Sequence, residues 1–236
     1  MLNAIVRYNG SAIADQVSQL ERAGRLKRFL APQVAELVLG EGNERLLDSH
    51  RRDVTVVFGD LRGFTAFAET AEPEEVMGVL REYHSALGPI VHKYEGTIER
   101  FIGDGFLVLF NDPLPCSDPP ARAIRMATEM RACIVRLAEG WRKHGHELGF
   151  AIGIAHGYAT LGRIGFEGRF DYSAIGTVVN LAARLCSQAS AGQILVDPKV
   201  YAAVEAEVDA EPAGELMLKG LSRAIKAFSV KTLAAA

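Results

Sequence analysis

The spacing of apolar residues changes partway along the chain. In the first part, apolar positions recur three or four residues apart, as at Leu26, Leu30 and Val34, and this spacing predicts helix. Residues 54–58 instead form a continuous run rich in β-branched side chains, which is typical of a buried strand. We therefore expect a helical N-terminal arm or linker over residues 1–52, followed by the main domain over residues 53–236.

The arm has two interpretations. Its apolar pattern is short and is interrupted by Gly24 and Pro32, so a long coiled coil is not predicted. It can be a satellite helix packed on the main domain. It can equally be a dimerising or signal-carrying linker from an upstream sensor domain.

Strand-like and helix-like runs alternate through the main domain. Their order, βαββαββ followed by αβαββ, favours one mixed sheet with flanking helices over separate all-α and all-β units. The predicted fold class is therefore α/β (α+β), ferredoxin-like in its centre. We expect strands at residues 54–58, 97–101, 106–110, 148–157, 159–165 and 193–196 and near Leu216 and Phe228, and helices at 76–91, from Asp118 to Trp141, at 177–189 and after Pro198.

Composition narrows the classes of function. The 236 residues are 49% hydrophobic and 23% charged, enough for one sizeable core. A net charge of -3 gives no broad basic surface, which argues against nucleic acid or an anionic membrane as a partner. The three cysteines lack metal-ligand or disulfide spacing, and no apolar run nears the roughly 20 residues of a membrane span. We expect a cytoplasmic protein without a membrane segment in this chain.

Two aspartates follow apolar strand-like runs and are flanked by glycine. Asp60 ends the first predicted strand, and Asp104 lies at the turn of a predicted hairpin. If these strands are neighbours, the carboxylates could hold two hard cations about 4 Å apart, as in phosphoryl transfer. A single Gly-Asp pair is also ordinary turn chemistry, so the hypothesis depends on both aspartates.

Other polar residues could meet the same ligand. The segment from Leu61 to Thr65 joins a strand to a helix, and its backbone N–H groups could face phosphate oxygens. Asn180 and Arg184 are four residues apart in a predicted helix, so they share one face. The amide could orient a ribose, and the guanidinium could neutralise charge on a transferring phosphoryl group. Either could also belong to a solvated helix face.

Three segments in order carry a family resemblance. VTVVFGDLRGFTAFAE, GTIERFIGDGFLVLFNDP and FDYSAIGTVVNLAARL, with the later LKGL, resemble the signature segments of class III adenylyl and guanylyl cyclases over roughly residues 50 to 232. The resemblance implies a palm-type fold, a homodimer with sites at the subunit interface, and two Mg²⁺ or Mn²⁺ ions. It further implies Asp60 and Asp104 as metal ligands, phosphate contacts from Phe58, Gly63, Phe64, Thr65 and Lys219, base recognition by Arg100 and Ser173, ribose orientation by Asn180, and transition-state stabilisation by Arg184 of the other subunit.

The two base-recognition positions depart from the family's usual residues. Adenylyl cyclases of the family usually have lysine where this chain has Arg100, and aspartate or threonine where it has Ser173. Serine is closer to the threonine-bearing subgroup than to guanylyl cyclases, so ATP is the expected substrate and GTP the alternative. Arg100 could contact a purine acceptor, or it could pair with Glu99 or another carboxylate outside the site. A weakly active nucleotide-binding or dimerisation module is the remaining interpretation.

Overall fold

The computed structural model describes residues 47–167, 169–217 and 224–234. Nearly all of the helical arm predicted over residues 1–52 lies outside these ranges, as does Lys219. The described residues belong to one compact unit, Leu46–Ala236.

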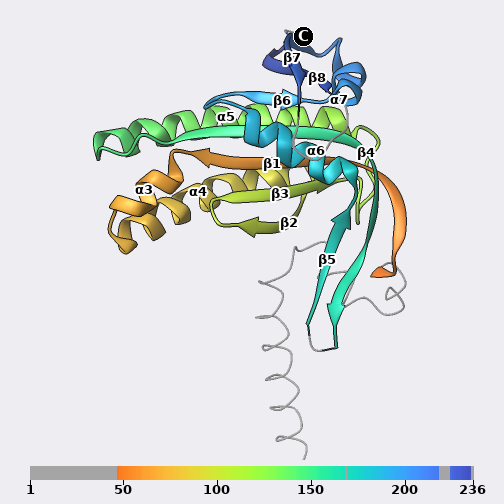
Figure 1. Ribbon diagram of the computed structural model, residues 1–236, viewed down its shortest axis with the longest axis horizontal. Coiled ribbons are helices and arrows are strands. Elements are labelled where there is room, and N and C mark those ends of the chain that lie inside the picture. Colours follow the sequence, from red (N-terminus) through yellow and green to blue (C-terminus); the bar gives the residue numbers. More distant parts are fainter. Residues whose placement is uncertain (1–46, 168, 218–223, 235–236) are drawn as a thin grey trace, which may run out of the picture. The chain divides into compact units, whose positions relative to one another are not determined.

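The structure describes one mixed sheet of eight strands (Figure 1). Its order is β2-β3-β1-β4-β6-β8-β7, and β5 extends β4 as a hairpin arm. All pairings are antiparallel except that of β4 with β6. The strands are β1 (His50–Arg62), β2 (Thr97–Ile102), β3 (Gly105–Phe110), β4 (Gly149–Phe166), β5 (Arg169–Ile175), β6 (Ile194–Val196), β7 (Val208–Leu216) and β8 (Ile225–Leu233).

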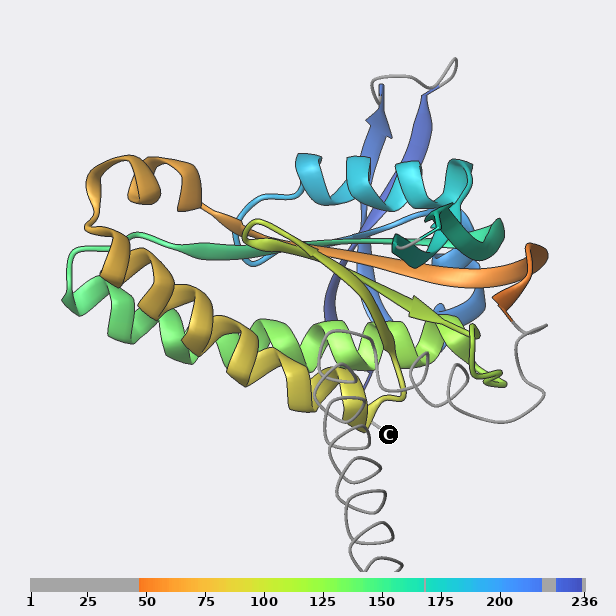
Figure 2. The same ribbon diagram turned by 90° about the horizontal axis from the view of Figure 1, so that it is seen from below.

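Helices cover both faces of this sheet. The described helices are α3 (Phe64–Thr70), α4 (Pro73–Lys93), α5 (Pro119–Lys143), α6 (Thr177–Gln188) and α7 (Pro198–Val204). Figure 2 shows α4 and α5 side by side on one face and α6 on the opposite face. Both long helices begin with proline, at Pro73 and Pro119, where the missing N–H costs nothing. None of the helices in the described ranges is both long enough and apolar enough to cross a bilayer.

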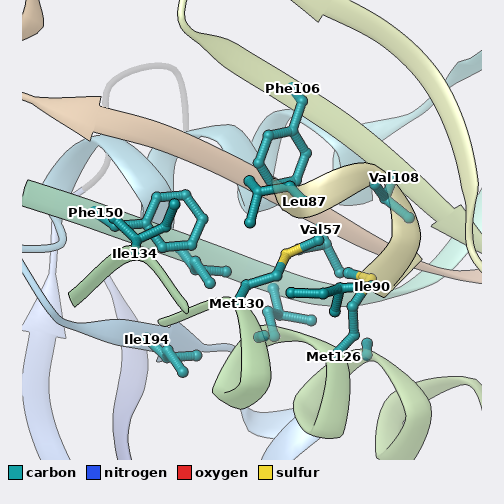
Figure 3. Close-up of a cluster of buried hydrophobic side chains, with 14 of the residues drawn as sticks. Val57, Leu87, Ile90, Phe106, Val108, Met126, Met130, Ile134, Phe150 and Ile194 are labelled. Atoms are coloured by element: carbon teal, nitrogen blue, oxygen red, sulfur yellow. The ribbon is translucent and has the colours of Figure 1, made fainter. Parts of the chain in front are cut away.

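The main core fills the space between the sheet and the two long helices (Figure 3). Val57 of β1 packs there with Met130 of α5 and Phe150 of β4, and all three are buried. Because successive side chains of a strand point to opposite faces, Phe58, Asp60 and Arg62 lie on the other face of β1. The core therefore fixes the direction of the polar end of the strand.

Small residues let α6 lie directly on the other face of the sheet. On β4, Gly153 alternates with the core residues Ile152 and Ile154. A Cβ at Gly153 would lie 2.1 Å from the backbone nitrogen of Cys186 in α6. A side chain at this position would lift the helix, so glycine is needed for the contact.

The element order agrees with the sequence-based prediction, with four differences. A single strand, β4 (Gly149–Phe166), replaces the two strands expected at residues 148–157 and 159–165. Strand β5 (Arg169–Ile175) lies outside the expected strand ranges. Helix α3 follows β1 at once, where no helix was expected. The main sheet also begins at His50, three residues before the predicted domain start at residue 53.

Candidate active site

The two predicted metal-binding aspartates lie beside each other. Gly59 of β1 pairs with Phe106 of β3, so the end of β1 lies beside the tip of the β2–β3 hairpin. The backbone N–H of Leu61 donates to Oδ2 of Asp104 at 3.1 Å. A Cβ on Gly105 would lie 3.3 Å from Oδ1 of Asp60. The condition on which the metal-site hypothesis depended, that these strands are neighbours, is met.

The two carboxylates interact strongly. The pKa of Asp60 is raised to about 6, first by burial and then by the charge of Asp104 and a hydrogen bond with it. Arg62 opposes this shift, since its Nη1 lies 2.9 Å from Oδ2 of Asp60. Half-buried carboxylates that repel each other are oxygen donors suited to a hard divalent cation, whose charge relieves the repulsion. In the described ranges, no set of three or more histidine, cysteine, aspartate or glutamate residues forms a metal cluster.

Arg62 joins Asp60 to helix α6, a link that sequence analysis missed. Its Nε donates to the carbonyl oxygen of Ala189 at 2.9 Å, and its Nη2 donates to that of Cys186. Both carbonyls belong to the C-terminal end of α6, where the last carbonyls lack an N–H four residues on, and that of Cys186 also accepts from the backbone N–H of Ala189 at 3.1 Å. The period-two rule places Arg62 on the same face as Asp60, which is the signal that could have identified it.

The loop expected to contact phosphates runs from β1 into α3. Gly63 has φ +84° and precedes the helix, and a Cβ there would lie 2.5 Å from the carbonyl oxygen of Glu147. Phe64 is half-buried against Phe67, with ring centroids 5.9 Å apart, and Phe58 is also half-buried on β1. Phe64 therefore contributes packing, while the loop backbone and the exposed side chain of Thr65 are left for a ligand.

The two predicted base-recognition residues contact each other. Nη2 of Arg100 donates to Oγ of Ser173 at 2.8 Å. Nε and Nη2 of Arg100 also donate to the two carboxylate oxygens of Glu99, at 2.6 and 2.7 Å. Of the alternatives left open by the sequence, the pairing of Arg100 with Glu99 is observed, and contact of Arg100 with a purine stays a prediction.

A buried network holds β5, and therefore Ser173, against the sheet. The carboxylate of Asp112 is fully buried and accepts from the hydroxyl of Tyr172, the residue before Ser173. The same carboxylate lies 2.8 Å from Nε2 of His50 and 3.4 Å from Nη1 of Arg52. Burial and Asp112 together raise the pKa of Tyr172, so this residue stays a hydrogen-bond donor. Sequence reasoning missed this network because its members lie far apart in the chain.

Asn180 and Arg184 lie on the outer side of α6. The opposite side buries Val178, Ala182 and Leu185 against the sheet, while both polar residues are exposed. Among the described residues, neither polar side chain makes a hydrogen bond or ion pair. The structure thus joins Asp60 with Asp104, and Arg100 with Ser173, but leaves Asn180 and Arg184 outside both pairs. Lys219 lies outside the described residues.

Comparisons with known proteins identify the family of this chain. The family described as the adenylate and guanylate cyclase catalytic domain matches residues 48–232. Adenylate cyclase 1 of Rhizobium meliloti is 31% identical over 183 residues, 76% of this chain and 28% of that protein. Adenylate cyclase of Anabaena cylindrica is 28% identical over 162 residues, 67% of this chain and 32% of that protein. The chain thus spans about a third or less of the length of these relatives.

Two solved structures share the fold at similar identity. The adenylyl cyclase CyaB from P. aeruginosa superimposes with a TM-score of 0.76 at 35% identity, covering 78% of this chain and 96% of that one. The guanylyl cyclase Cya2 gives a TM-score of 0.73 at 32% identity, covering 79% and 95%. This chain therefore belongs to the adenylate and guanylate cyclase catalytic domain family, the class III nucleotidyl cyclases.

Proposed function

We propose that this domain converts ATP into 3′,5′-cyclic AMP and pyrophosphate at the interface of a homodimer. The observation that carries the proposal is the meeting of Asp60 and Asp104 at one end of the sheet, where burial and then the charge of Asp104 raise the pKa of Asp60 to about 6. Two carboxylates that gain from a neutralising cation suit a reaction in which a polyphosphate is the leaving group.

Asp60 and Asp104 would hold two Mg²⁺ or Mn²⁺ ions. Magnesium is commonly bound by one or two carboxylates together with substrate phosphates, so this pair provides enough protein ligands. When bound, the ions would lower the pKa of the attacking hydroxyl and neutralise charge on the phosphates. Arg62 would keep the Asp60 carboxylate directed toward this position through its 2.9 Å ion pair.

The reaction is an in-line displacement within one substrate molecule. The ribose 3′-oxygen attacks the α-phosphorus, the bond from that phosphorus to the bridging oxygen breaks, and pyrophosphate leaves. The loop of Gly63 and Thr65 would bind the phosphates through backbone N–H groups, and Lys219 would bind the triphosphate. No covalent enzyme intermediate is required.

Each site would take its carboxylates from one chain and its α6 residues from the other. Asn180 would orient the ribose, and Arg184 would stabilise the charge that develops on the transferring phosphoryl group. Their exposure on α6, without partners among the described residues, supports a role toward a second chain. A homodimer with two-fold symmetry would form two such sites.

Arg100 and Ser173 would select the base. Arginine only donates hydrogen bonds, whereas a serine hydroxyl both donates and accepts, and adenine offers the matching acceptor and amino donor. The similarity to the guanylyl cyclase Cya2 makes GTP the second candidate substrate.

Product analysis tests this function. The purified chain is incubated with ATP or GTP and Mg²⁺ or Mn²⁺, and the nucleotides are separated by chromatography. We expect cyclic AMP and equimolar pyrophosphate, both abolished by Asp104→Ala and retained by Asp209→Ala, a change on the distant strand β7. Cyclic GMP as the main product would assign the second candidate. No turnover of either nucleotide would leave a nucleotide-binding or dimerisation module as the better account.

A further inference from the structure

Glu99 is a buried carboxylate to which the proposed reaction gives no role. Its side chain is 3% exposed, whereas that of the adjacent Arg100 is 47% exposed. Successive residues of a regular strand point to opposite faces. These two nonetheless meet, because the register of β2 against β3 shifts between Ile98 and Arg100, and Glu99 is the additional residue. A bulge of this kind redirects a side chain.

The bulge lets Glu99 occupy most of the hydrogen-bonding capacity of Arg100. A guanidinium has five N–H donors. Glu99 accepts from Nε at 2.6 Å and from Nη2 at 2.7 Å, and Ser173 accepts from Nη2 at 2.8 Å. The two N–H groups of Nη1 remain, because no described residue accepts from them. Arg100 therefore offers a substrate one nitrogen instead of a two-pronged fork.

This restriction separates the two purines chemically. Arginine recognises guanine best when two of its nitrogens donate together to O6 and N7, and Glu99 and Ser173 already use both donors of Nη2. Adenine requires only one donor, toward a ring nitrogen, and an acceptor for its amino group. Nη1 of Arg100 can supply the donor, and Oγ of Ser173 keeps a lone pair for the amino group.

We propose that Glu99 is a positioning residue for base selection, which holds Arg100 against Ser173 so that the site accepts adenine and disfavours guanine. This inference rests on the proposed function, because it assumes that Arg100 and Ser173 face the purine. Glu99 itself does not touch the substrate. It acts by occupying donors of Arg100, so that two guanidinium nitrogens cannot donate together to O6 and N7 of guanine.

The test compares the unmodified chain with Glu99→Gln, which keeps the size of the side chain and removes its charge. The kcat/KM for ATP and for GTP is measured, together with the Kd of fluorescent N-methylanthraniloyl derivatives of both nucleotides. Glu99→Asp, whose shorter side chain loosens the clamp, provides a second variant should the first unfold. The matched control is Glu211→Gln, because Glu211 forms an ion pair with Lys231 at 2.6 Å on another part of the sheet.

We expect Glu99→Gln to lower the preference for ATP over GTP by at least about tenfold, both in the ratio of kcat/KM values and in the ratio of binding affinities. The loss of a charge-assisted hydrogen-bonded pair has this order of effect. Glu99→Asp should shift the ratio in the same direction by less, and Glu211→Gln should leave it unchanged. In an Arg100→Lys background, which has no fork to release, Glu99→Gln should change the ratio less than about twofold.

An unchanged ratio in the folded Glu99→Gln variant would overturn the inference, as would an equal shift in the Arg100→Lys background. These results differ from a failure of the proposed function, which would show as no cyclic product from the unmodified chain. In that case the nucleotide Kd values still decide the role of Glu99, because binding does not require turnover.

Discussion

Replacing Gly153 with alanine should damage stability and activity together. A Cβ at this position would lie 2.1 Å from the backbone nitrogen of Cys186 and 2.3 Å from the carbonyl oxygen of Ala182, both in α6. Non-bonded heavy atoms normally approach to about 3.5 Å, so the helix has to withdraw by about 1.4 Å. Overpacking of this kind costs about 1–3 kcal/mol, and each kcal/mol lowers the Tm of a domain of this size by about 2–4 °C.

In Gly153→Ala, cyclase turnover should fall by more than the loss of folding stability alone would cause. Helix α6 carries Asn180 and Arg184, and a displacement of about 1 Å in a catalytic group can cost about 10²-fold in rate. Thermal unfolding and cyclase turnover are measured for Gly153→Ala and for the control Gly157→Ala, on the same strand, where the nearest atom to a new Cβ is 3.5 Å away. The reasoning is refuted if both variants melt and turn over like the unmodified chain.

Two further predictions concern the charged networks. Without divalent cations, the free energy of unfolding should fall as the pH rises from about 4 to about 6, because folded Asp60, with a pKa of about 6 against 3.8 ordinarily, keeps a proton that the unfolded chain releases. Asp104→Asn should make this dependence shallower without abolishing it, because the burial of Asp60 remains, and should remove the stabilisation by Mg²⁺ at pH 7.5. An unchanged slope in calorimetry would contradict the part of the shift assigned to Asp104. Tyr172→Phe removes a donor to buried Asp112 and should lower the free energy of unfolding by about 1–3 kcal/mol. The exposed control Tyr158→Phe should change it by less than about 0.5 kcal/mol in urea unfolding, and equal effects would count against the network.

Local pattern was sufficient for most of the fold. The β-rich run at residues 54–58, the glycines beside Asp104 and the proline starts of the long helices each specify nearby structure, and these elements agree with the structure. The single long strand β4 was missed because Gly157 interrupts the apolar pattern, although the strand continues through it, paired with Val54 of β1. Whether the strand continues through Gly157 depends on its pairing with β1, which lies elsewhere in the chain.

The site was predictable where strand alternation or helix spacing applied. Asp60, Asp104, Asn180 and Arg184 could be placed from their own neighbours in the sequence. The contacts of Glu99 and Arg62 could not be predicted, because those of Glu99 depend on a bulge in the pairing of β2 with β3 and those of Arg62 on carbonyls at the end of α6. Both sets of contacts join segments that tertiary packing brings together, and local periodicity does not predict such contacts.

Mixing two inactive variants tests most directly whether one chain supplies the carboxylates and another supplies α6. Asp60→Ala and Arg184→Ala are each purified, shown to be folded, combined in equal amounts and assayed for cyclic nucleotide. Random exchange makes half of the dimers mixed, with one intact site of two in each, so recovery of about a quarter of the unmodified activity is expected. Activity no higher than that of either variant alone, under conditions where mixed dimers form, would contradict the shared site.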